Sequence, residues 1–176
     1  MGKLRNLKMF ILMPLNAILS VTIILLLLFR GLYPSWMWVF PLNILLTIVG
    51  LIFIFVGAFL VIKTTILFSK IGNGTVAHWD PPKKLVIYSV YLHMRNPMIF
   101  GILLTVFGEI VIFSSLSLVP YFLFLLIGHH LLFTKYEEPE LIQRFGEDYI
   151  LYMKNVPRWI PRLKPWEGFQ SGNSKI

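Results

Sequence analysis

Two long apolar runs constrain this chain more than any other feature of its sequence. Residues 9–29 and 38–62 form runs of 21 and 25 residues, and the second has only Asn43 and Thr47 as polar interruptions. A helix rises about 1.5 Å per residue, so either run reaches about 30 Å, the thickness of a bilayer's hydrocarbon core. Hydrophobic residues make up 57% of the chain and charged residues only 14%. These proportions exclude an ordinary soluble enzyme and indicate a membrane protein.

The first run resembles a signal peptide in one respect, because Lys3, Arg5 and Lys8 precede it. It is long, however, and residues 29–32 offer no cleavage pattern of small residues. We therefore expect residues 9–29 to be retained as a membrane span. Trp36 and Trp38 supply aromatic anchors at the start of the second span.

Two shorter apolar runs follow, at residues 98–113 and 119–133, and the serine-rich segment 114–118 separates them. This pattern predicts a tight antiparallel helical hairpin. We expect an all-α, multi-pass membrane bundle of about four transmembrane helices. Its three parts would be an N-terminal helix pair (1–68), a cytosolic connector (69–97), and a catalytic hairpin with a cytosolic C-terminal helical segment (98–176).

Charge orients these four spans. With the N-terminus inside, fifteen of the sixteen Lys and Arg residues fall on the cytosolic side and only Arg30 falls outside. Short cytoplasmic loops carry this excess, so both termini are expected to be cytoplasmic. The net charge of +8 then reflects orientation and anionic headgroups, and we expect no nucleic-acid partner. The chain contains no cysteine, which excludes disulfides, thiolate metal sites and a cysteine nucleophile.

The start of the third span is the first candidate site. Asn is a favoured N-cap and Pro is favoured at the first helical position, so Asn96 and Pro97 predict a helix start at the cytosolic interface. Free amide groups there, with Arg95 beside them, attract a carboxylate or phosphate. The alternative is a simple helix cap beside an arginine whose long side chain extends to the membrane–water interface.

A group of carboxylates follows the fourth span. Glu137, Glu138 and Glu140 lie at a helix C-terminus, where negative charge is unfavourable. Because both ends of a hairpin lie at the same membrane face, Arg95 is expected to come within reach of Glu137 or Glu138. A structural salt bridge and a ligand site both explain this arrangement. We expect Gln at Glu137 or Glu138 to leave the protein folded, as surface carboxylates contribute little to packing.

Three ionisable residues lie within the hairpin itself. Adjacent histidines on a helix point about 100° apart, so His129 and His130 do not form a metal site, and we expect no metal. A buried pair between Glu109 and one of these histidines is the favoured interpretation, and a functional role is the alternative. Gly101 and Gly108 are seven residues apart on one helix face, where small residues let helices approach closely.

Two stretches together resemble a known family, the isoprenylcysteine carboxyl methyltransferases and phospholipid N-methyltransferases. The first resembles the family's Arg-His/Asn-Pro signature and comprises Asp80-Pro81-Pro82-Lys83-Lys84-Leu85-Val86, then Arg95-Asn96-Pro97-Met98 and Gly101. The second resembles its C-terminal cofactor motif and comprises Glu137-Glu138-Pro139-Glu140-Leu141, Phe145-Gly146, Tyr149, Tyr152 and Val156-Pro157-Arg158-Trp159-Ile160-Pro161-Arg162. Ile99 stands where the family commonly has Tyr, and Ser89 where it has Gly.

The resemblance implies an integral-membrane methyltransferase that binds S-adenosylmethionine at the cytosolic side of the hairpin. A lipid or lipidated acceptor would enter from the bilayer. We expect Arg95 and Glu138 to be catalytic and treat Arg158 as an arginine outside the site. The expected cofactor-binding residues are Tyr91, His93, Asn96, Pro97, Gly101, Glu137, Glu138 and Tyr149.

The residues themselves also suit this cofactor, which carries a carboxylate, an ammonium and a sulfonium. The helix start at Arg95 suits the carboxylate, Glu137 and Glu138 suit the ammonium or ribose hydroxyls, and Tyr91, Phe100 or Tyr149 could place a ring on the sulfonium.

Two alternative functions remain. One is a membrane sterol-type reductase using NADPH, against which the glutamate pair argues because the 2′-phosphate needs positive groups. The other is a non-catalytic membrane scaffold.

Overall fold

The computed structural model describes residues 19–28, 40–72 and 83–168. The parts of the first run, the aromatic anchors and the connector that fall in the gaps lie outside the described residues. Within those three ranges the structure is helical and contains no strand, which confirms the all-α prediction. A short helix, Leu19–Leu28, comes first. The later elements are α2 (Leu42–Lys70), the 3₁₀ turn η3 (Ser89–Leu92), α3 (Pro97–Phe113), α4 (Leu118–Leu132), the π turn η4 (Phe133–Glu137), α5 (Glu138–Phe145) and α6 (Glu147–Asn155).

Two of the helices in the described ranges are long and apolar enough to cross a membrane. They are α2 and the continuous helix Leu118–Phe145, which joins α4, η4 and α5. In their most apolar windows only 17% and 6% of the residues are buried inside the protein. Water would penalise so much exposed apolar surface, whereas a bilayer accommodates it. Leu19–Leu28 and α3 are shorter, and the count of four spans stays a prediction.

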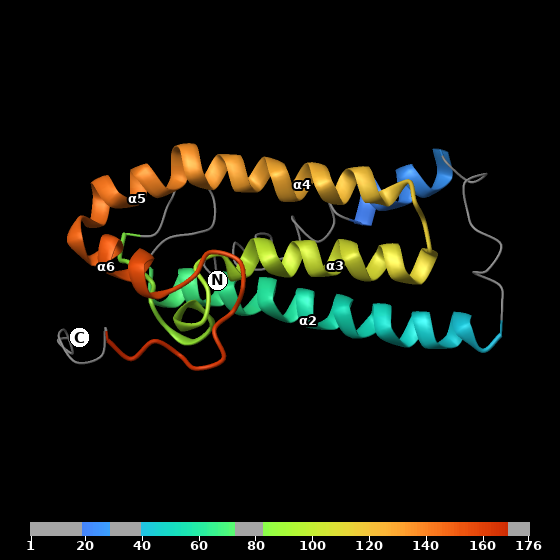
Figure 1. The fold of residues 1–176 in the computed structure, drawn as a ribbon, viewed down its shortest axis with the longest axis horizontal. Coiled ribbons are helices and arrows are strands. Elements are labelled where there is room, and N and C mark those ends of the chain that lie inside the picture. Colours follow the sequence, from blue (N-terminus) through green and yellow to red (C-terminus); the bar gives the residue numbers. More distant parts are fainter. Residues whose placement is uncertain (1–18, 29–39, 73–82, 169–176) are drawn as a thin grey trace, which may run out of the picture.

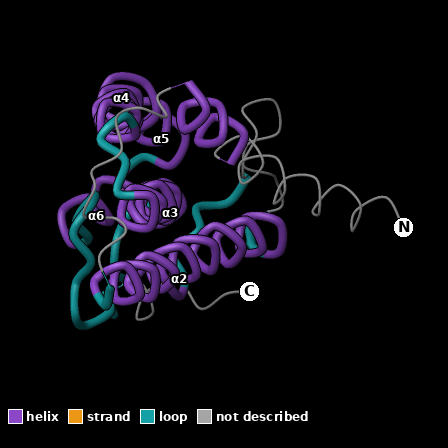
Figure 2. The backbone as a smooth tube through the Cα atoms, turned by 90° about the vertical axis from the view of Figure 1, so that its right-hand side faces the viewer, coloured by secondary structure: helices purple, strands orange, loops and turns teal. Residues whose placement is uncertain are grey.

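Helix α3 lies between α2 and α4, and the views in Figures 1 and 2 agree on this order. Its contact with α2 depends on four glycines. A Cβ added to Gly101 would lie 2.7 Å from the carbonyl oxygen of Gly57, and one added to Gly108 would lie 2.6 Å from that of Gly50. The two backbones therefore pack directly against each other, which confirms the predicted use of Gly101 and Gly108.

The predicted hairpin is also confirmed. Helix α3 ends at Phe113 and α4 begins at Leu118, within one residue of the expected boundaries. Ser114 takes a left-handed conformation at φ 47°, and the hydroxyls of Ser115 and Ser117 are 2.7 Å apart. These short polar side chains provide the tight turn.

The predicted pair between Glu109 and a histidine is wrong. Glu109 Oε2 accepts a hydrogen bond from Thr22 Oγ1 at 2.6 Å, so the carboxylate joins α3 to the Leu19–Leu28 helix. His129 Nδ1 lies 2.7 Å from the carbonyl of Leu125 in its own helix. In an antiparallel hairpin Glu109 is near the turn and the histidines are near the open end, so the two kinds of residue lie too far apart along the helices.

The fourth apolar helix does not end at residue 133 as predicted. Pro139 has no N–H to donate to the carbonyl four residues before it, and its ring crowds that carbonyl. The chain widens into the π turn η4 instead, where the Glu138 N–H donates to the Phe133 carbonyl, five residues back. The helix therefore continues through α5 and brings Glu138 into the protein, where it is 5% exposed.

Candidate functional site at the start of helix α3

The candidate site lies where α3 begins and the helix α4–η4–α5 passes above it. Asn96 occupies the N-cap position and Pro97 the first turn of α3, as predicted. The C-terminal strap, residues 156–166, closes around this end of the helix (Figure 1). The Arg95 N–H donates to the Pro157 carbonyl at 2.9 Å and the Arg162 N–H donates to the His93 carbonyl at 2.9 Å. The strap thereby fixes the approach to α3.

A buried carboxylate joins two arginines at the centre of this site. Arg95 Nη1 donates to Glu138 Oε1 at 2.6 Å. Arg158 binds the same carboxylate with two donors, Nε to Oε1 at 2.8 Å and Nη2 to Oε2 at 2.6 Å. The side chains of Arg95 and Glu138 are only 9% and 7% exposed. This confirms the predicted contact between Arg95 and the glutamate pair and shows that Glu138 is the partner.

This burial overturns the expectation that Glu138 is a surface carboxylate that contributes little to the fold. One buried carboxylate is the counter-charge that joins two guanidinium groups in a site largely shielded from water. Removing that charge leaves both cations uncompensated, which destabilises a protein strongly. Glu138 is therefore a structural support of the site, whatever else it does.

Two buried donors at this helix start have no hydrogen-bond partner among the described residues. They are Nε of Arg95 and Nδ2 of Asn96, and the Asn96 residue is 7% exposed. Its side chain makes no capping bond to α3. A buried donor without an acceptor is costly, and such groups in native proteins point to a missing partner. Together with the unpaired amides of the first helical turn, they form a surface that favours an anion.

Two tyrosines of α6 support the site from below. Tyr149 is 4% exposed and Tyr152 is 3% exposed. The Tyr152 hydroxyl donates to the Tyr91 carbonyl at 2.7 Å, and its ring packs against Trp166 of the strap. Burial raises the pKa of Tyr149 above its ordinary value, although the Arg95 guanidinium beside it acts in the opposite direction. Tyr149 is therefore a neutral hydroxyl next to Arg95 at physiological pH.

Two further predicted cofactor residues, His93 and Tyr91, contact other parts of the protein. Nδ1 of His93 lies 2.7 Å from the Arg162 carbonyl, so this ring contacts the strap. The Tyr91 ring is buried against Phe68 of α2, in the apolar cluster that also includes Leu67 and Val86. Their roles toward a cofactor stay predictions.

Gly101 and Glu137, the last two predicted cofactor residues, lie at a helix contact and in the π turn respectively. Gly101 faces α2, where it permits the close backbone contact described above. Glu137 is half-buried in the π turn, next to the buried Glu138. The structure thus brings together Arg95, Asn96, Pro97, Glu138 and Tyr149, whereas Gly101 faces α2.

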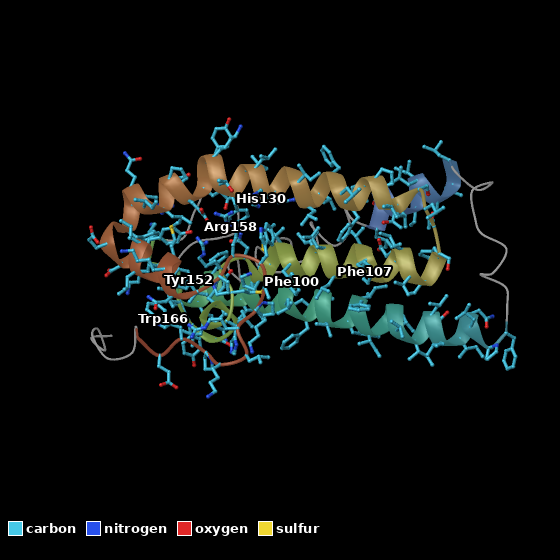
Figure 3. All side chains as sticks on the ribbon, viewed as in Figure 1. Phe100, Phe107, His130, Tyr152, Arg158 and Trp166 are labelled. Carbon is cyan, nitrogen blue, oxygen red and sulfur yellow. The ribbon has the colours of Figure 1, made fainter. Side chains whose placement is uncertain are left out.

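Arg158 and Trp159 are the residues that the sequence reasoning missed. The prediction that Arg158 lies outside the site is wrong, because its guanidinium donates hydrogen bonds to both carboxylate oxygens of Glu138. Trp159 Nε1 donates to His130 Nδ1 at 3.2 Å, which joins the strap to α4. Both residues belong to the C-terminal stretch that carries the family resemblance, and that was the available signal. Figure 3 shows Arg158 on the side of the site that faces α4, close to His130.

No group of three His, Cys, Asp or Glu side chains that could hold a metal ion occurs within residues 19–28, 40–72 and 83–168. The polar groups that the site does present are two guanidinium groups, one shared carboxylate, a buried amide donor and tyrosines. A helical membrane protein with such a cluster at one end of a hairpin has the features of an enzyme that binds a zwitterionic or anionic ligand beside the bilayer.

Comparison with known families gives the class of that enzyme. The family model of the phospholipid methyltransferases matches residues 45–148, which is more than half of the chain and includes Arg95 and Glu138. The chain belongs to the phospholipid methyltransferase family, and it is accordingly a membrane methyltransferase of a family that acts on lipids. Searches of curated proteins and of solved structures found no match.

Proposed function

We propose that this protein transfers a methyl group from S-adenosylmethionine to a lipid or lipidated acceptor at the cytosolic face of the membrane. The observation that carries this proposal is the pair of buried donors without partners, Arg95 Nε and Asn96 Nδ2, at the start of α3. Family membership supports the reaction type. The donor pair supports a ligand that brings a carboxylate to this point.

The residues present fit S-adenosylmethionine. Its carboxylate would accept hydrogen bonds from Arg95 Nε, Asn96 Nδ2 and the first-turn amides of α3. Glu138 would hold Arg95 in the orientation that leaves Nε available, because it already binds Nη1 of that guanidinium. Glu137 is the acidic side chain that we assign to the ammonium or the ribose hydroxyls, and the Tyr149 ring is a neutral neighbour for the sulfonium.

When bound, the cofactor supplies an electrophilic methyl group on a positively charged sulfur. Attack by a nucleophilic atom of the acceptor on that carbon would displace the sulfur as a neutral thioether. Such a displacement needs little covalent help from the protein. Orientation and exclusion of water therefore account for most of what the residues contribute.

The protein's contribution to this reaction is the rigid end of α3. The strap and Glu138, which Arg158 also binds, fix Arg95 on one side, and Tyr149 and Tyr152 lie on the other. A group held in this way loses little freedom when its ligand arrives, which increases affinity. The cytosolic position of the site rests on the charge distribution of the four proposed spans.

The position of the site in the cell is tested with reporter fusions at the C-terminus and within residues 30–35. We expect a reporter that is active in the cytosol to work at the C-terminus and to fail in the 30–35 loop. The opposite result would invert the protein and place the site on the other face of the membrane.

The cofactor is tested with a variant that separates binding from folding. Asn96 Nδ2 has no acceptor in the described protein, so Asn96→Ala should leave the melting temperature unchanged. It should nevertheless weaken S-adenosylmethionine binding by roughly tenfold to a hundredfold, which corresponds to one hydrogen bond to a charged group of about 1.5 to 3 kcal/mol. Isothermal titration calorimetry measures the affinity.

The matched control is Asn155→Ala, which removes an exposed side chain that donates to the Leu151 carbonyl of its own helix. It should bind the cofactor like the wild type. If Asn96→Ala and Asn155→Ala bind equally well, the assignment of the carboxylate site is wrong. If the wild type binds NADPH and not S-adenosylmethionine, the methyl donor itself is wrong.

A further inference from the structure

The C-terminal strap exposes two large apolar side chains among basic residues. Leu163 is 99% exposed and Ile160 is 78% exposed, the highest values among the large hydrophobic side chains of the described residues. Residues 158–167 also carry three basic side chains and one acidic side chain: Arg158, Arg162, Lys164 and Glu167. Water penalises such apolar exposure, whereas apolar side chains flanked by Lys and Arg are typical of segments that lie in a membrane interface.

The hydrogen bonds of the strap place it at the level where α3 enters the apolar layer. Backbone hydrogen bonds join the strap to residues 92, 93 and 95, directly before α3 begins at Pro97. The apolar run of this helix starts one residue later, at Met98. Figure 1 shows the strap beside this end of α3. The strap is therefore at the height of the interface and not far out in the water.

Trp159 fixes this level more closely. It lines an apolar cavity of about 180 Å³ between α3 and α4, together with residues that include Phe100 and Leu126. Its indole N–H donates to His130 Nδ1. An apolar ring with one polar partner is the arrangement that Trp favours at a membrane interface. Ile160 follows Trp159 directly, and one residue of chain spans at most about 3.6 Å, so Ile160 lies at nearly the same depth.

The backbone of the strap also suits a region with little water. Pro157, Pro161 and Pro165 have no N–H. The N–H groups of Arg162 and Trp166 are already paired with the carbonyls of residues 93 and 92. An irregular segment tolerates such a region better when fewer of its donors depend on water.

Charge identifies the kind of surface that the strap fits. Arg162 comes directly before Leu163, and the exposed Lys164 comes directly after it. Long basic side chains extend from an inserted apolar residue to the headgroup phosphates. An anionic leaflet attracts basic residues that lie close to its surface. The strap therefore complements an anionic leaflet in both its apolar and its charged side chains.

We propose that the strap docks on the anionic headgroup layer of the leaflet around the start of α3, with Ile160 and Leu163 inserted and with Arg162 and Lys164 bound to phosphates. Lipid is a docking surface in this inference, which does not depend on the methyl donor or the acceptor. The strap also holds Arg95 through its backbone and Glu138 through Arg158. Docking would therefore help to fix the site end of α3.

Spin labelling tests the depth of the strap. The chain contains no cysteine, so a nitroxide attached to Leu163→Cys reports on that position alone. The full-length protein is placed in phosphatidylcholine vesicles with or without phosphatidylglycerol. Collisions of the label with oxygen, which concentrates in lipid, are compared with collisions with a water-soluble nickel chelate. The control is Gln143→Cys, at an exposed position of α5.

We expect the label at 163 to collide several-fold less with nickel and more with oxygen than the label at 143, and this difference should increase with phosphatidylglycerol. Equal collision rates at the two positions would overturn the proposal. A second copy of the chain on the strap would broaden the spectrum until unlabelled protein is added. A covering segment of the same chain would lower both collision rates in either kind of vesicle. Either of these results would also overturn the proposal.

The charge is tested by removing one lysine at a time. Lys164→Gln should reduce several-fold the effect of phosphatidylglycerol on nickel collisions at position 163. Lys154→Gln, which changes an exposed lysine in the last turn of α6, should leave that effect unchanged. Both variants should melt like the wild type in detergent, because both side chains are exposed. An equal effect of phosphatidylglycerol in the two variants would refute the anionic contact.

Discussion

The two faces of α3 are both apolar, yet they are held to their neighbours in different ways. On one face, Gly50, Gly57, Gly101 and Gly108 allow the backbones of α2 and α3 to touch. On the other face, large side chains such as Phe100 and Phe107 leave a cavity against α4. The α4 side is joined at its ends by the serine turn and by the cluster of Glu138 with its two arginines, and between them Phe122, Leu125 and Leu126 pack against α3.

This difference shows how an apolar helix can serve stability and ligand binding at once. In lipid, apolar side chains gain little by leaving the solvent, so close packing between helices depends on small residues that bring backbones together. Where those residues are absent, neighbouring helices can stay apart if polar contacts hold their ends. The α2 face is therefore closely packed, and the α4 face retains an apolar cavity.

The largest expected effect comes from breaking the polar connection on the α4 side. Glu138→Gln removes the charge shared by Arg95 and Arg158, whose side chains are only 9% and 20% exposed, and leaves both guanidinium groups without this counter-charge. We expect a loss of about 3 to 5 kcal/mol of folding stability. Thermal unfolding in detergent micelles measures it. Glu140→Gln is the control, since Glu140 is 51% exposed and pairs only with Arg144 of its own helix among the described ion pairs. Equal melting of the two variants would contradict the structural role of Glu138.

One added methyl group is enough to disrupt the close contact between α2 and α3. Gly57→Ala places a Cβ against the backbone oxygen of Gly101, which cannot move without shifting α3. We expect a loss of about 1 to 3 kcal/mol, as in other overpacked interiors. Gly128→Ala on α4 is the matched control, because a Cβ there meets nothing within 4 Å. The control should be neutral or more stable by up to about 1 kcal/mol, since alanine favours a helix over glycine. Similar stability of both variants would argue against the glycine contact.

Arg95→Lys tests whether methyl transfer depends on the guanidinium group at the start of α3. Lysine keeps the charge near Glu138 but lacks the planar fork that offers both Nη1 and Nε. We expect kcat/KM for methyl transfer to fall by roughly tenfold to a hundredfold, which corresponds to about 1.5 to 3 kcal/mol. Transfer of radiolabelled methyl into membrane lipid measures it. Arg144→Lys, which changes a partly exposed arginine of α5, should retain activity. An Arg95→Lys variant with wild-type kinetics would show that the fork is not used.

The smallest expected effect concerns the segment that leads into α3. Ser89 has a φ of 55°, at the position where the resembling family has glycine. A left-handed conformation costs an ordinary residue about 1 to 2 kcal/mol, and glycine avoids that cost but loses about 0.5 to 1 kcal/mol through greater freedom in the unfolded chain. Ser89→Gly should therefore stabilise the protein by about 0.5 to 1 kcal/mol in thermal unfolding. Ser69→Gly, in helical α2, should destabilise it, and a stabilising Ser69→Gly would contradict this reasoning.

The hairpin and the contact between Arg95 and Glu138 could be predicted from the sequence, because an antiparallel hairpin brings its two open ends to one level. The same rule excludes the Glu109–histidine pair, since those residues lie at opposite ends of the hairpin. The role of Arg158 could not be derived from local pattern. It depends on the path of residues 156–166 across the start of α3, which is set by backbone contacts such as that between Arg95 and Pro157.

The glycine face was predictable on α3 but not on α2. Gly101 and Gly108 share a face by their spacing, whereas the identity of their partners, Gly57 and Gly50, depends on the register between two helices that are joined by a long connector. The π turn was missed for a different reason. The missing N–H of Pro139 acts on the turn before it, so its effect does not show in the motif that contains Pro139.

The π turn also matters for anyone who recombines this protein with a relative. A helix advances about 100° per residue, so the extra residue that η4 accommodates sets the direction in which everything after it faces. Deleting one residue from Phe133–Glu137 would rotate Glu138 away from Arg95 while leaving every amino acid of the site in the chain. A chimera that joins α4 of one protein to α5 of another must therefore inherit the turn itself, because matching site residues would not preserve their common orientation.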